Sequence, residues 1–482
     1  MELEKTVVNA TRWTSASMLG RAMLYFAQIT ILARLLAPED FGLMAIVISL
    51  TTIFSIVSDF GISKVIFSKN HFSPAELSNL YWLNIVIGAL IFIIVAASAP
   101  LIAKIYGNAK IASLLIFSAT IVPINTVSSL LKAIAEKKLA FASVSIIELI
   151  AMFVGVTFAI VSAWFGAGVY SIALGAVATS AMSTILVVAY LSNGVRPKLT
   201  VKIRELRDYL TFGAHSTGEQ FINNINGQLD ILLAGLFFGD QLVGIFSVPK
   251  NLLLKLGLLV NSVATRVGLP AIASVRNDRV RIQSIYLKTI AITSFVNFPI
   301  FFFILFFAEN IVSVFLGEGW ESSVIYFQIF SIWAAIRSTG NPVGSLAYAL
   351  GRARLIFYWN VCLTGLFFLC YFLGLYFYGA VGLAISMLIL QLLIFILLWR
   401  FLIHPLSGIR LVVYANQFVR PVLISAISAW FANSLVFYLE SDFIKLTAGS
   451  ILMGVFYLLL SLKYNKGCVD MISSVIGKRK HL

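Results

Sequence analysis

Long apolar runs alternate along the whole chain with short polar connections, and this alternation is the strongest pattern in the sequence. A helix needs about 20 apolar residues to cross a hydrocarbon core of about 30 Å, where the backbone must satisfy its own hydrogen bonds. The predicted fold class is therefore an all-α integral membrane protein with about fourteen membrane-spanning helices. Their boundaries are 14–36, 42–64, 79–103, 111–131, 141–164, 168–191, 209–237, 242–266, 286–308, 322–347, 355–377, 380–403, 418–439 and 443–462.

The Lys and Arg residues outside these helices fall almost entirely on alternate connections. Twenty-six of them lie on the side that holds the N-terminus, whereas the opposite side holds only Arg34, Lys104, Lys110 and Lys445. Basic residues concentrate on the cytosolic side of a membrane protein. We therefore expect a multi-pass protein with both termini in the cytosol.

Composition agrees with a membrane protein and excludes most soluble classes. Hydrophobic residues make up 60% of the 482 residues and charged residues only 11%, whereas soluble domains carry about 25% charged residues. The net charge of +15 also suits nucleic-acid binding, but the basic residues lie in short loops between apolar runs, where they set membrane orientation. We expect no nucleic-acid partner.

Few residues favour a metal, a cofactor or a catalytic centre. The four histidines are scattered and the three cysteines lack the spacing of a metal site, so we expect neither metal nor cofactor. No connection is long enough for a catalytic domain. An enzyme, such as a membrane-embedded glycosyltransferase or ligase, is therefore disfavoured.

Weak similarity between two parts of the chain indicates an internal repeat, as in many secondary transporters. NTVSSLLKAIAEKKLAF at 125–141 resembles NPVGSLAYALGRARLIF at 341–357, and two further pairs of segments match in the same order. Pro123 and Pro342 lie near the middle of the two corresponding helices, where each predicts a bend.

The two copies are separated by six predicted helices, so both start on the cytosolic side. The sequence predicts two pseudo-symmetric six-helix bundles, an N-terminal lobe at 1–195 and a C-terminal lobe at 209–403. A further helix pair and a basic cytosolic tail occupy 404–482.

Charged residues inside the predicted helices are the candidates for a functional site. A charge at the bilayer centre costs about 3 kcal/mol even on the lenient insertion scale, so such residues should face a partner or a water-filled cavity. We assign the cations to substrate binding and the acids to ion coupling or gating. The cations are Arg21, Lys250, Lys255 and Arg337, and the acids are Asp59, Glu148, Glu219 and Asp230.

Two predicted helices carry a polar face that recurs every three or four residues, a spacing that places each set on one side of a helix. The sets are Ser17, Arg21, Tyr25 and Gln28 in the first helix and His215, Glu219, Asn223, Asn226 and Asp230 in the seventh. Two interpretations stay open: a shared water-accessible cleft, or polar contacts between packed helices. In the cleft interpretation, Gln28 and Asn226 belong to the substrate site. Asn341 belongs to it as well, because it shares a helix face with Arg337.

Two ion pairs compete with these assignments. Asp230 and Lys250 lie at a similar depth on the two arms of one predicted hairpin, and Arg21 and Asp59 do so on another. Each pair is open to a structural interpretation in place of a functional one.

Several segments together resemble a known transporter family. LARLLAPEDFGLMAIVISL, SDFGISKVIFSK and LSNLYWLNIVIG in the first half are similar to the polysaccharide transporter branch of the multidrug/oligosaccharidyl-lipid/polysaccharide exporter superfamily. QLDILLAGLFFGDQLVGIFSV, FLGEGWESSVIYFQIFSI and LAYALGRARLIFYWN continue the resemblance in the second half. It covers nearly the whole chain and includes the fourteen-helix layout, but no segment identifies a sugar.

The resemblance implies two lobes around a central cationic cavity in the bacterial cytoplasmic (inner) membrane. It implies export of an undecaprenyl-diphosphate-linked oligosaccharide by alternating access, for cell-surface polysaccharide assembly. The expected partners are this polyprenyl-diphosphate-linked oligosaccharide and membrane lipids, with glycosyltransferases or a polysaccharide polymerase as further partners of a monomeric protein.

One alternative function is a multidrug or cation antiporter of the related multidrug and toxin extrusion type. An antiporter for cations predicts a cavity dominated by acids. The predicted helices instead hold five basic residues, because Arg266 lies near the cytosolic end of its helix in addition to the four cations above, against four acids. This slight excess favours an anionic substrate.

Overall fold

The computed structural model describes residues 2–59, 66–67, 72–192, 203–275, 278–340 and 342–470. These residues form helices and contain no strand, which confirms the all-α prediction for the described part of the chain. The helices of the first half are α1 (Glu2–Leu35), α2 (Pro38–Asp59), α4 (Pro74–Tyr106), α5 (Lys110–Ala119), α6 (Ile121–Lys137), α7 (Phe141–Trp164), α8 (Tyr170–Leu191) and α9 (Ile203–Phe237).

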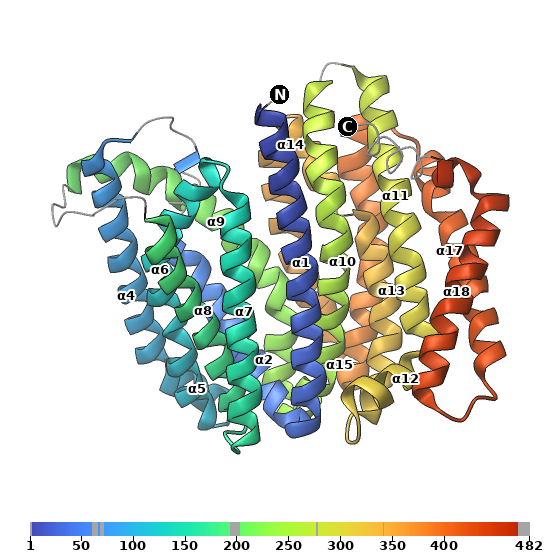
Figure 1. The fold of residues 1–482 in the computed structure, drawn as a ribbon, viewed down its shortest axis with the longest axis horizontal. Coiled ribbons are helices and arrows are strands. Elements are labelled where there is room, and N and C mark those ends of the chain that lie inside the picture. Colours follow the sequence, from blue (N-terminus) through green and yellow to red (C-terminus); the bar gives the residue numbers. More distant parts are fainter. Residues whose placement is uncertain are drawn as a thin grey trace. The chain divides into compact units, whose positions relative to one another are not determined.

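The second half begins with two long helices and ends with an antiparallel pair (Figure 1). Its α-helices are α10 (Asp240–Ser274), α11 (Arg279–Phe306), α12 (Ala308–Ile311), α13 (Val324–Gly340), α14 (Pro342–Ala349), α15 (Ala353–Leu398), α16 (His404–Ser407), α17 (Leu411–Val436) and α18 (Asp442–Tyr464). Short π or 3-10 turns lie between them: η1 (Val312–Leu316), η2 (Glu321–Ser323) and η3 (Trp399–Ile403).

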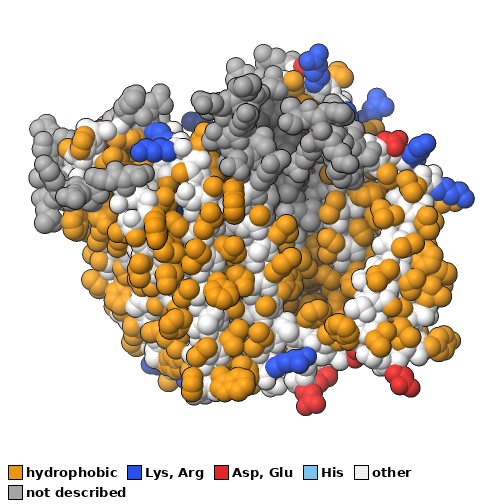
Figure 2. All heavy atoms as spheres, viewed as in Figure 1, with side chains coloured by type: hydrophobic (Ala, Val, Ile, Leu, Met, Phe, Trp, Pro, Cys, Tyr) orange, Lys and Arg blue, Asp and Glu red, His pale blue; other side chains and the backbone are white. Residues whose placement is uncertain are grey.

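Eleven segments among the described residues are long and apolar enough to cross a membrane, by length and composition. Hydrophobic side chains cover the middle of the face drawn in Figure 2, and charged side chains gather near its upper and lower margins. This is the surface of a multi-pass membrane protein. Each of the fourteen segments predicted from hydropathy falls on a helix or a helix pair, while the count of fourteen spans stays a prediction.

The count of eleven segments is lower than the predicted fourteen partly because α15 is counted as part of one segment. Its 46 residues would extend about 69 Å as a straight helix, more than twice a hydrocarbon core. The backbone breaks at Tyr378 and Gly379, where Gly379 has φ 61° and ψ −146°. The predicted helices 355–377 and 380–403 lie on the two sides of this break.

An interruption also occurs near the first proline of the repeat. α5 ends at Ala119 and α6 begins at Ile121, two residues before Pro123. Proline lacks an N–H group and clashes with the preceding turn, so this break occurs where the sequence predicts a bend. In the second copy α13 and α14 lie on either side of residue 341, which is outside the described residues, so the bend at Pro342 stays a prediction.

The contacts divide the chain into two compact units, Met1–Ser247 and Val248–Leu482. In the first unit α7 packs against α1 and α8, α6 packs against α8 and α4, and α2 packs against α9. In the second unit α11 packs against α13 and α17, and α17 packs against α18. The division into 1–195, 209–403 and 404–482 stays a prediction, since these contacts group α9 with the helices of the first half.

Small residues allow the closest helix contacts of the first unit. A Cβ atom at Gly155 of α7 would lie 1.8 Å from the Thr179 hydroxyl oxygen and 2.6 Å from the Gly175 carbonyl oxygen of α8. Close backbone approach between small residues drives helix association where apolar burial adds little. The α7–α8 contact is therefore fixed by residues that carry almost no side chain.

The starts of α2 and α10 approach each other even more closely, and the approach is reciprocal. A Cβ atom at Gly42 would lie 1.7 Å from the carbonyl oxygen of Asp240, and one at Gly244 would lie 1.8 Å from that of Pro38. The two contacts are symmetric, because Gly42 lies four residues after Pro38 and Gly244 lies four residues after Asp240. Beside this crossing, the Asn108 side-chain amide donates to Asp240 Oδ2 at 2.6 Å.

The core of the second unit is built around two buried tyrosines. Tyr286 of α11 and Tyr414 of α17 are fully buried, and Tyr414 stacks on Phe395 with ring centroids 5.3 Å apart. The Tyr414 hydroxyl donates to the Thr339 carbonyl at 3.4 Å. Through these contacts the C-terminal pair α17–α18 forms part of the second unit.

Candidate functional site

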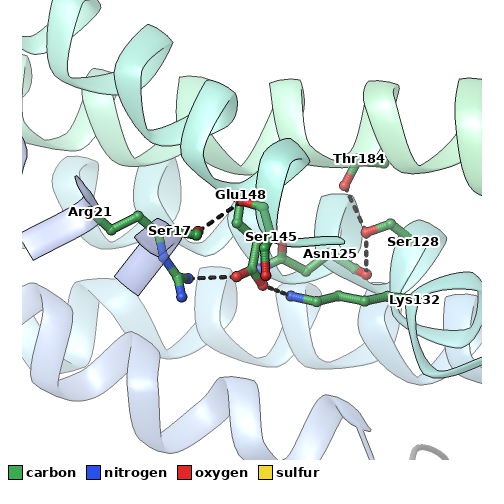
Figure 3. A network of polar contacts seen from close by, with 8 residues as sticks. All are labelled: Ser17, Arg21, Asn125, Ser128, Lys132, Ser145, Glu148 and Thr184. Carbon is green, nitrogen blue, oxygen red and sulfur yellow. Dashed lines mark hydrogen bonds and ion pairs between the residues drawn. The ribbon is translucent and has the colours of Figure 1, made fainter. Parts of the chain in front are cut away.

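A polar network joins α1, α6, α7 and α8 inside the first unit (Figure 3). Each of its helices is apolar on most of its surface, and α7 has a mean hydropathy of 2.5 over its most apolar window. The members recur at helical spacing, so each helix directs its polar side chains to one face. They are Ser17, Arg21, Asn125, Ser128, Lys132, Ser145, Glu148 and Thr184.

Two cations share one carboxylate at the centre of the network. Arg21 Nη1 donates to Glu148 Oε2 at 2.6 Å, and Lys132 Nζ donates to the other oxygen, Oε1. The side chains of Arg21 and Lys132 are each 33% exposed and that of Glu148 is 22% exposed. Glu136, one turn after Lys132, interacts electrostatically with both Lys132 and Glu148. The ion cluster of Arg21, Lys132 and Glu148 thus lies partly exposed beside a second carboxylate.

Packing between α1 and α7 brings these charges together. Gly20 allows the approach, since a Cβ atom there would lie 2.9 Å from Leu149 Cδ1. One turn away, the buried Ser17 hydroxyl donates to the Ser145 carbonyl at 2.8 Å. Ser17 therefore acts as a polar contact between packed helices, one of the two interpretations of the first polar stripe.

Hydroxyl groups extend the network from α6 to α8. Ser180 donates to Asn125 Oδ1 at 2.5 Å, and Thr184 donates to the Ile124 carbonyl at 3.0 Å. The Ser128 and Thr184 hydroxyl oxygens lie 3.0 Å apart. These bonds fix α6 on α8 and so fix the position of Lys132, one turn beyond Ser128.

The ion cluster lies toward one end of its helices. Glu148 is about 10 Å along α7 from Phe141, and Lys132 is about 8 Å before the end of α6, at 1.5 Å per residue. An unpaired charge at such a depth costs energy in lipid, whereas a paired and hydrated one costs far less. The cluster satisfies both conditions, because its charges are paired and partly exposed.

The second unit carries two further cations that the sequence assigns to substrate binding. Lys255 of α10 and Arg337 of α13 are both exposed. The Arg337 guanidinium carbon lies 5.2 Å from the ring centroid of Trp333, one turn earlier on the same helix. This cation–π contact holds the guanidinium against α13 without neutralising it.

The remaining predicted site residues have contrasting environments. Asp230 and Lys250 are 1% and 3% exposed, whereas Gln28 and Asn226 are half-buried. The side chains of Asp59 and Glu219, together with residue Asn341, lie outside the described residues. Of the predicted site residues that the structure describes, Arg21 and Glu148 form an ion pair.

Lys132 is the functional candidate that sequence reasoning missed. The predicted helix 111–131 ends one residue before Lys132 and so leaves it in a cytosolic connection, but the structure places it on α6, five residues before the helix ends. A signal was present, because Asn125, Ser128 and Lys132 follow at spacings of three and four and so share one helix face. Among the described residues, no group of His, Cys, Asp and Glu has the arrangement of a metal site.

Comparison with known proteins places this fold in a family. The family described as polysaccharide biosynthesis protein matches residues 31–325, more than half of the chain. The lipopolysaccharide biosynthesis protein WzxC of Escherichia coli (strain K12) is 28% identical over 408 residues, covering 85% of this chain and 83% of that protein.

Two solved structures share the fold. The inward closed conformation of the lipid II flippase MurJ has a TM-score of 0.76 and 13% identity, covering 94% of this chain and 99% of that one. An inward-facing multidrug resistance MATE family transporter of the MOP superfamily has a TM-score of 0.60 and 13% identity, covering 82% of this chain and 98% of that one. The chain belongs to the polysaccharide biosynthesis protein family, in the polysaccharide transporter branch of the multidrug/oligosaccharidyl-lipid/polysaccharide exporter superfamily.

Proposed function

We propose that the protein is a flippase that moves an undecaprenyl-diphosphate-linked oligosaccharide from the cytosolic to the outer leaflet, for cell-surface polysaccharide synthesis. The observation that carries this proposal is the ion cluster of the first unit. Arg21 and Lys132 converge on the single carboxylate of Glu148, which brings two cations together at a partly exposed site inside the helix bundle. The family membership and the similarity to the lipopolysaccharide biosynthesis protein WzxC support the same class of substrate.

A diphosphate head group suits this cluster because it can replace Glu148. The Arg21 guanidinium offers two parallel N–H donors to phosphate oxygens, and Lys132 adds a compact charge. As the head group arrives, Arg21 and Lys132 turn from the carboxylate to the phosphates. Glu148 then restores the original pairs when the substrate leaves, which makes it a gating residue.

Lys255 and Arg337 would bind the head group at another stage of the crossing. Both side chains are exposed, Lys255 near the middle of α10 and Arg337 in the last turn of α13, and a charge that faces lipid at the bilayer centre costs about 3 kcal/mol. Their surface therefore faces water during at least part of the cycle. In this proposal Lys250 adds a further cation, Gln28, Asn226 and Asn341 donate to phosphate or sugar oxygens, and Asp59, Glu219 and Asp230 serve coupling or gating.

The proposed cycle is alternating access, with rocking of the lobes 1–195 and 209–403 and support from the helices of 404–482. The protein would lie in the bacterial inner membrane as a monomer with both termini in the cytosol, where it receives its substrate from glycosyltransferases and supplies a polysaccharide polymerase. A cysteine-free variant with one cysteine at Gly239 should react with impermeant thiol reagents from outside. The same cysteine at Asp278 should react only after permeabilisation, and labelling at 278 from outside would refute the orientation.

Glycan export in cells tests the function through the cluster. Arg21→Gln and Lys132→Gln should each reduce surface glycan severalfold with the protein still present in the membrane, and Arg21→Lys should retain part of the activity. Normal export by a double Arg21→Gln, Lys132→Gln variant would exclude head-group binding by the cluster. An antiporter for cations would instead need an available acid here, whereas Glu148 is engaged by two cations and the nearby Glu136 interacts with Lys132.

A further inference from the structure

An open groove of about 1240 Å³ lies on the second unit, between the α14–α15 turn and the segment that contains η3 and α16. It is far along the chain from the ion cluster and takes no part in the proposed transport step. Its lining residues are Leu350, Gly351, Arg352, Arg354, Leu355, Tyr358, Phe401, Pro405 and Leu406.

One wall of the groove is a rigid turn that presents two arginines. Gly351 has φ +71°, a conformation that L side chains rarely adopt. The Arg352 N–H donates to the Ala347 carbonyl at 2.9 Å, and the Gly351 N–H donates to the Tyr348 carbonyl at 3.0 Å. These two bonds form a Schellman motif, which fixes the backbone from which Arg352 and Arg354 project.

Hydrogen bonds from neighbouring side chains stabilise the segment that forms the opposite wall of the groove. Arg279 Nε and the Gln283 side-chain amide both donate to the Ser407 carbonyl, at 3.2 Å and 2.8 Å. The Trp399 indole N–H donates to the Ile409 carbonyl at 2.9 Å. The groove is thus bounded by two braced segments, although its rim is open.

The lining combines two positive charges with an apolar surface and contains no acidic residue. Tyr358 and Phe401 are 64% and 56% exposed, and Leu355 is 36% exposed. Aromatic and aliphatic side chains next to arginines at a helix end are typical of the level where lipid head groups meet acyl chains. Basic pockets between helices at this level bind anionic lipid head groups.

We propose that this groove binds an anionic phospholipid of the cytosolic leaflet. Arg352 and Arg354 contact the head-group phosphate, and one acyl chain lies along Leu355, Tyr358 and Phe401. Charge complementarity selects an anionic lipid over a zwitterionic one, because a neutral head group gains nothing net from two uncompensated arginines. The apolar wall selects a lipid over free phosphate.

Lipid binding to the purified full chain tests this proposal. Native mass spectrometry during titration with phosphatidylglycerol or phosphatidylcholine gives an apparent affinity for each lipid. Each arginine near an anionic head group contributes about fivefold in affinity. Arg352→Gln with Arg354→Gln should weaken phosphatidylglycerol binding by about 25-fold and leave phosphatidylcholine binding unchanged. The double lysine variant at the same positions should recover most of the affinity.

A matched control removes two charges outside the groove. Arg281 is exposed and pairs with Asp278 at 3.1 Å, and Arg410 precedes α17 without lining the groove. Arg281→Gln with Arg410→Gln should weaken phosphatidylglycerol binding by less than about threefold, as expected for a diffuse electrostatic contribution. Equal losses in the groove and control variants would overturn the proposal, as would equal binding of the two lipids.

Two further titrations separate the alternative ligands. Inorganic phosphate at millimolar concentration should not displace phosphatidylglycerol, and short-chain phosphatidylglycerol should bind more weakly than the long-chain lipid. Displacement by phosphate alone would overturn the role of the apolar wall. Tight binding of undecaprenyl diphosphate without binding of phosphatidylglycerol would assign the groove to the transported substrate and refute the phospholipid proposal.

Discussion

Replacing Glu148 by Gln removes the one negative charge that Arg21 and Lys132 share. The isosteric amide keeps the volume of the side chain but leaves two cations facing each other across it. An ion pair at 4 Å has an energy of about 4 kcal/mol at an effective dielectric constant of 20, whereas exposed pairs contribute about 1 kcal/mol or less. With side chains 22–33% exposed, we expect an intermediate loss, about 2–3 kcal/mol for the two pairs together.

A second substitution separates this electrostatic loss from a packing defect. Adding Lys132→Gln to Glu148→Gln removes the repulsion and leaves Arg21 with a neutral amide acceptor. The double variant should therefore be more stable than Glu148→Gln alone by about 1 kcal/mol. A double-mutant cycle isolates this interaction energy between the two positions. Glu440→Gln, in an exposed connection, is the matched control for loss of one acidic charge.

The assay combines thermal unfolding in detergent, abundance in the membrane and surface glycan. Glu148→Gln should lower the unfolding temperature and abundance, and the double variant should recover both in part without recovering export. An unfolding temperature of Glu148→Gln equal to that of Glu440→Gln would refute the shared-carboxylate account. Full export by Glu148→Gln would refute its gating role.

Three other predictions concern separate regions. Gly42→Ala should strongly reduce abundance in the membrane, because its Cβ atom would lie 1.7 Å from a backbone carbonyl oxygen that cannot rotate away. Gly239→Ala is the control and should not reduce abundance, since a Cβ atom there meets nothing within 4 Å. Equal abundance of the two variants would contradict this prediction. Arg337→Glu should abolish export at unchanged abundance and Arg337→Lys should retain part of it, so normal export by Arg337→Glu would exclude its role. Asp230→Asn should destabilise the protein by about 3–5 kcal/mol if Asp230 neutralises Lys250. Adding Lys250→Gln should restore abundance in part but should not restore export. Rescue of both abundance and export by the double variant would make the pair structural.

The sequence predicts the helices well because bilayer thickness imposes their length and composition. The predicted segments 141–164 and 168–191 nearly coincide with α7 and α8. Pro123 lies next to a helix break as predicted, since a missing N–H group is a local property of the chain.

The contacts between helices were less accessible to sequence reasoning. Depth along a predicted hairpin suggests Asp59 as a partner of Arg21, a pair that stays a prediction because the Asp59 side chain lies outside the described residues. Chain order gives no indication of the pair that the structure does show, Arg21 with Glu148, 127 positions away. Neighbours in a hairpin are fixed by chain order, whereas the α1–α7 contact depends on small residues such as Gly20. Lys132 was missed for a related reason, because a lysine close to a helix end looks like an ordinary connection residue.

Transport by the purified protein tests the central claim most directly. Proteoliposomes would contain a fluorescent undecaprenyl-diphosphate-linked oligosaccharide, and an added glycosidase would measure its appearance in the outer leaflet. The account predicts transfer by the unaltered protein, a severalfold slower transfer by the Arg21→Gln, Lys132→Gln variant, and no uptake of a cationic dye. Unchanged transfer by that variant, or dye uptake without lipid transfer, would contradict it.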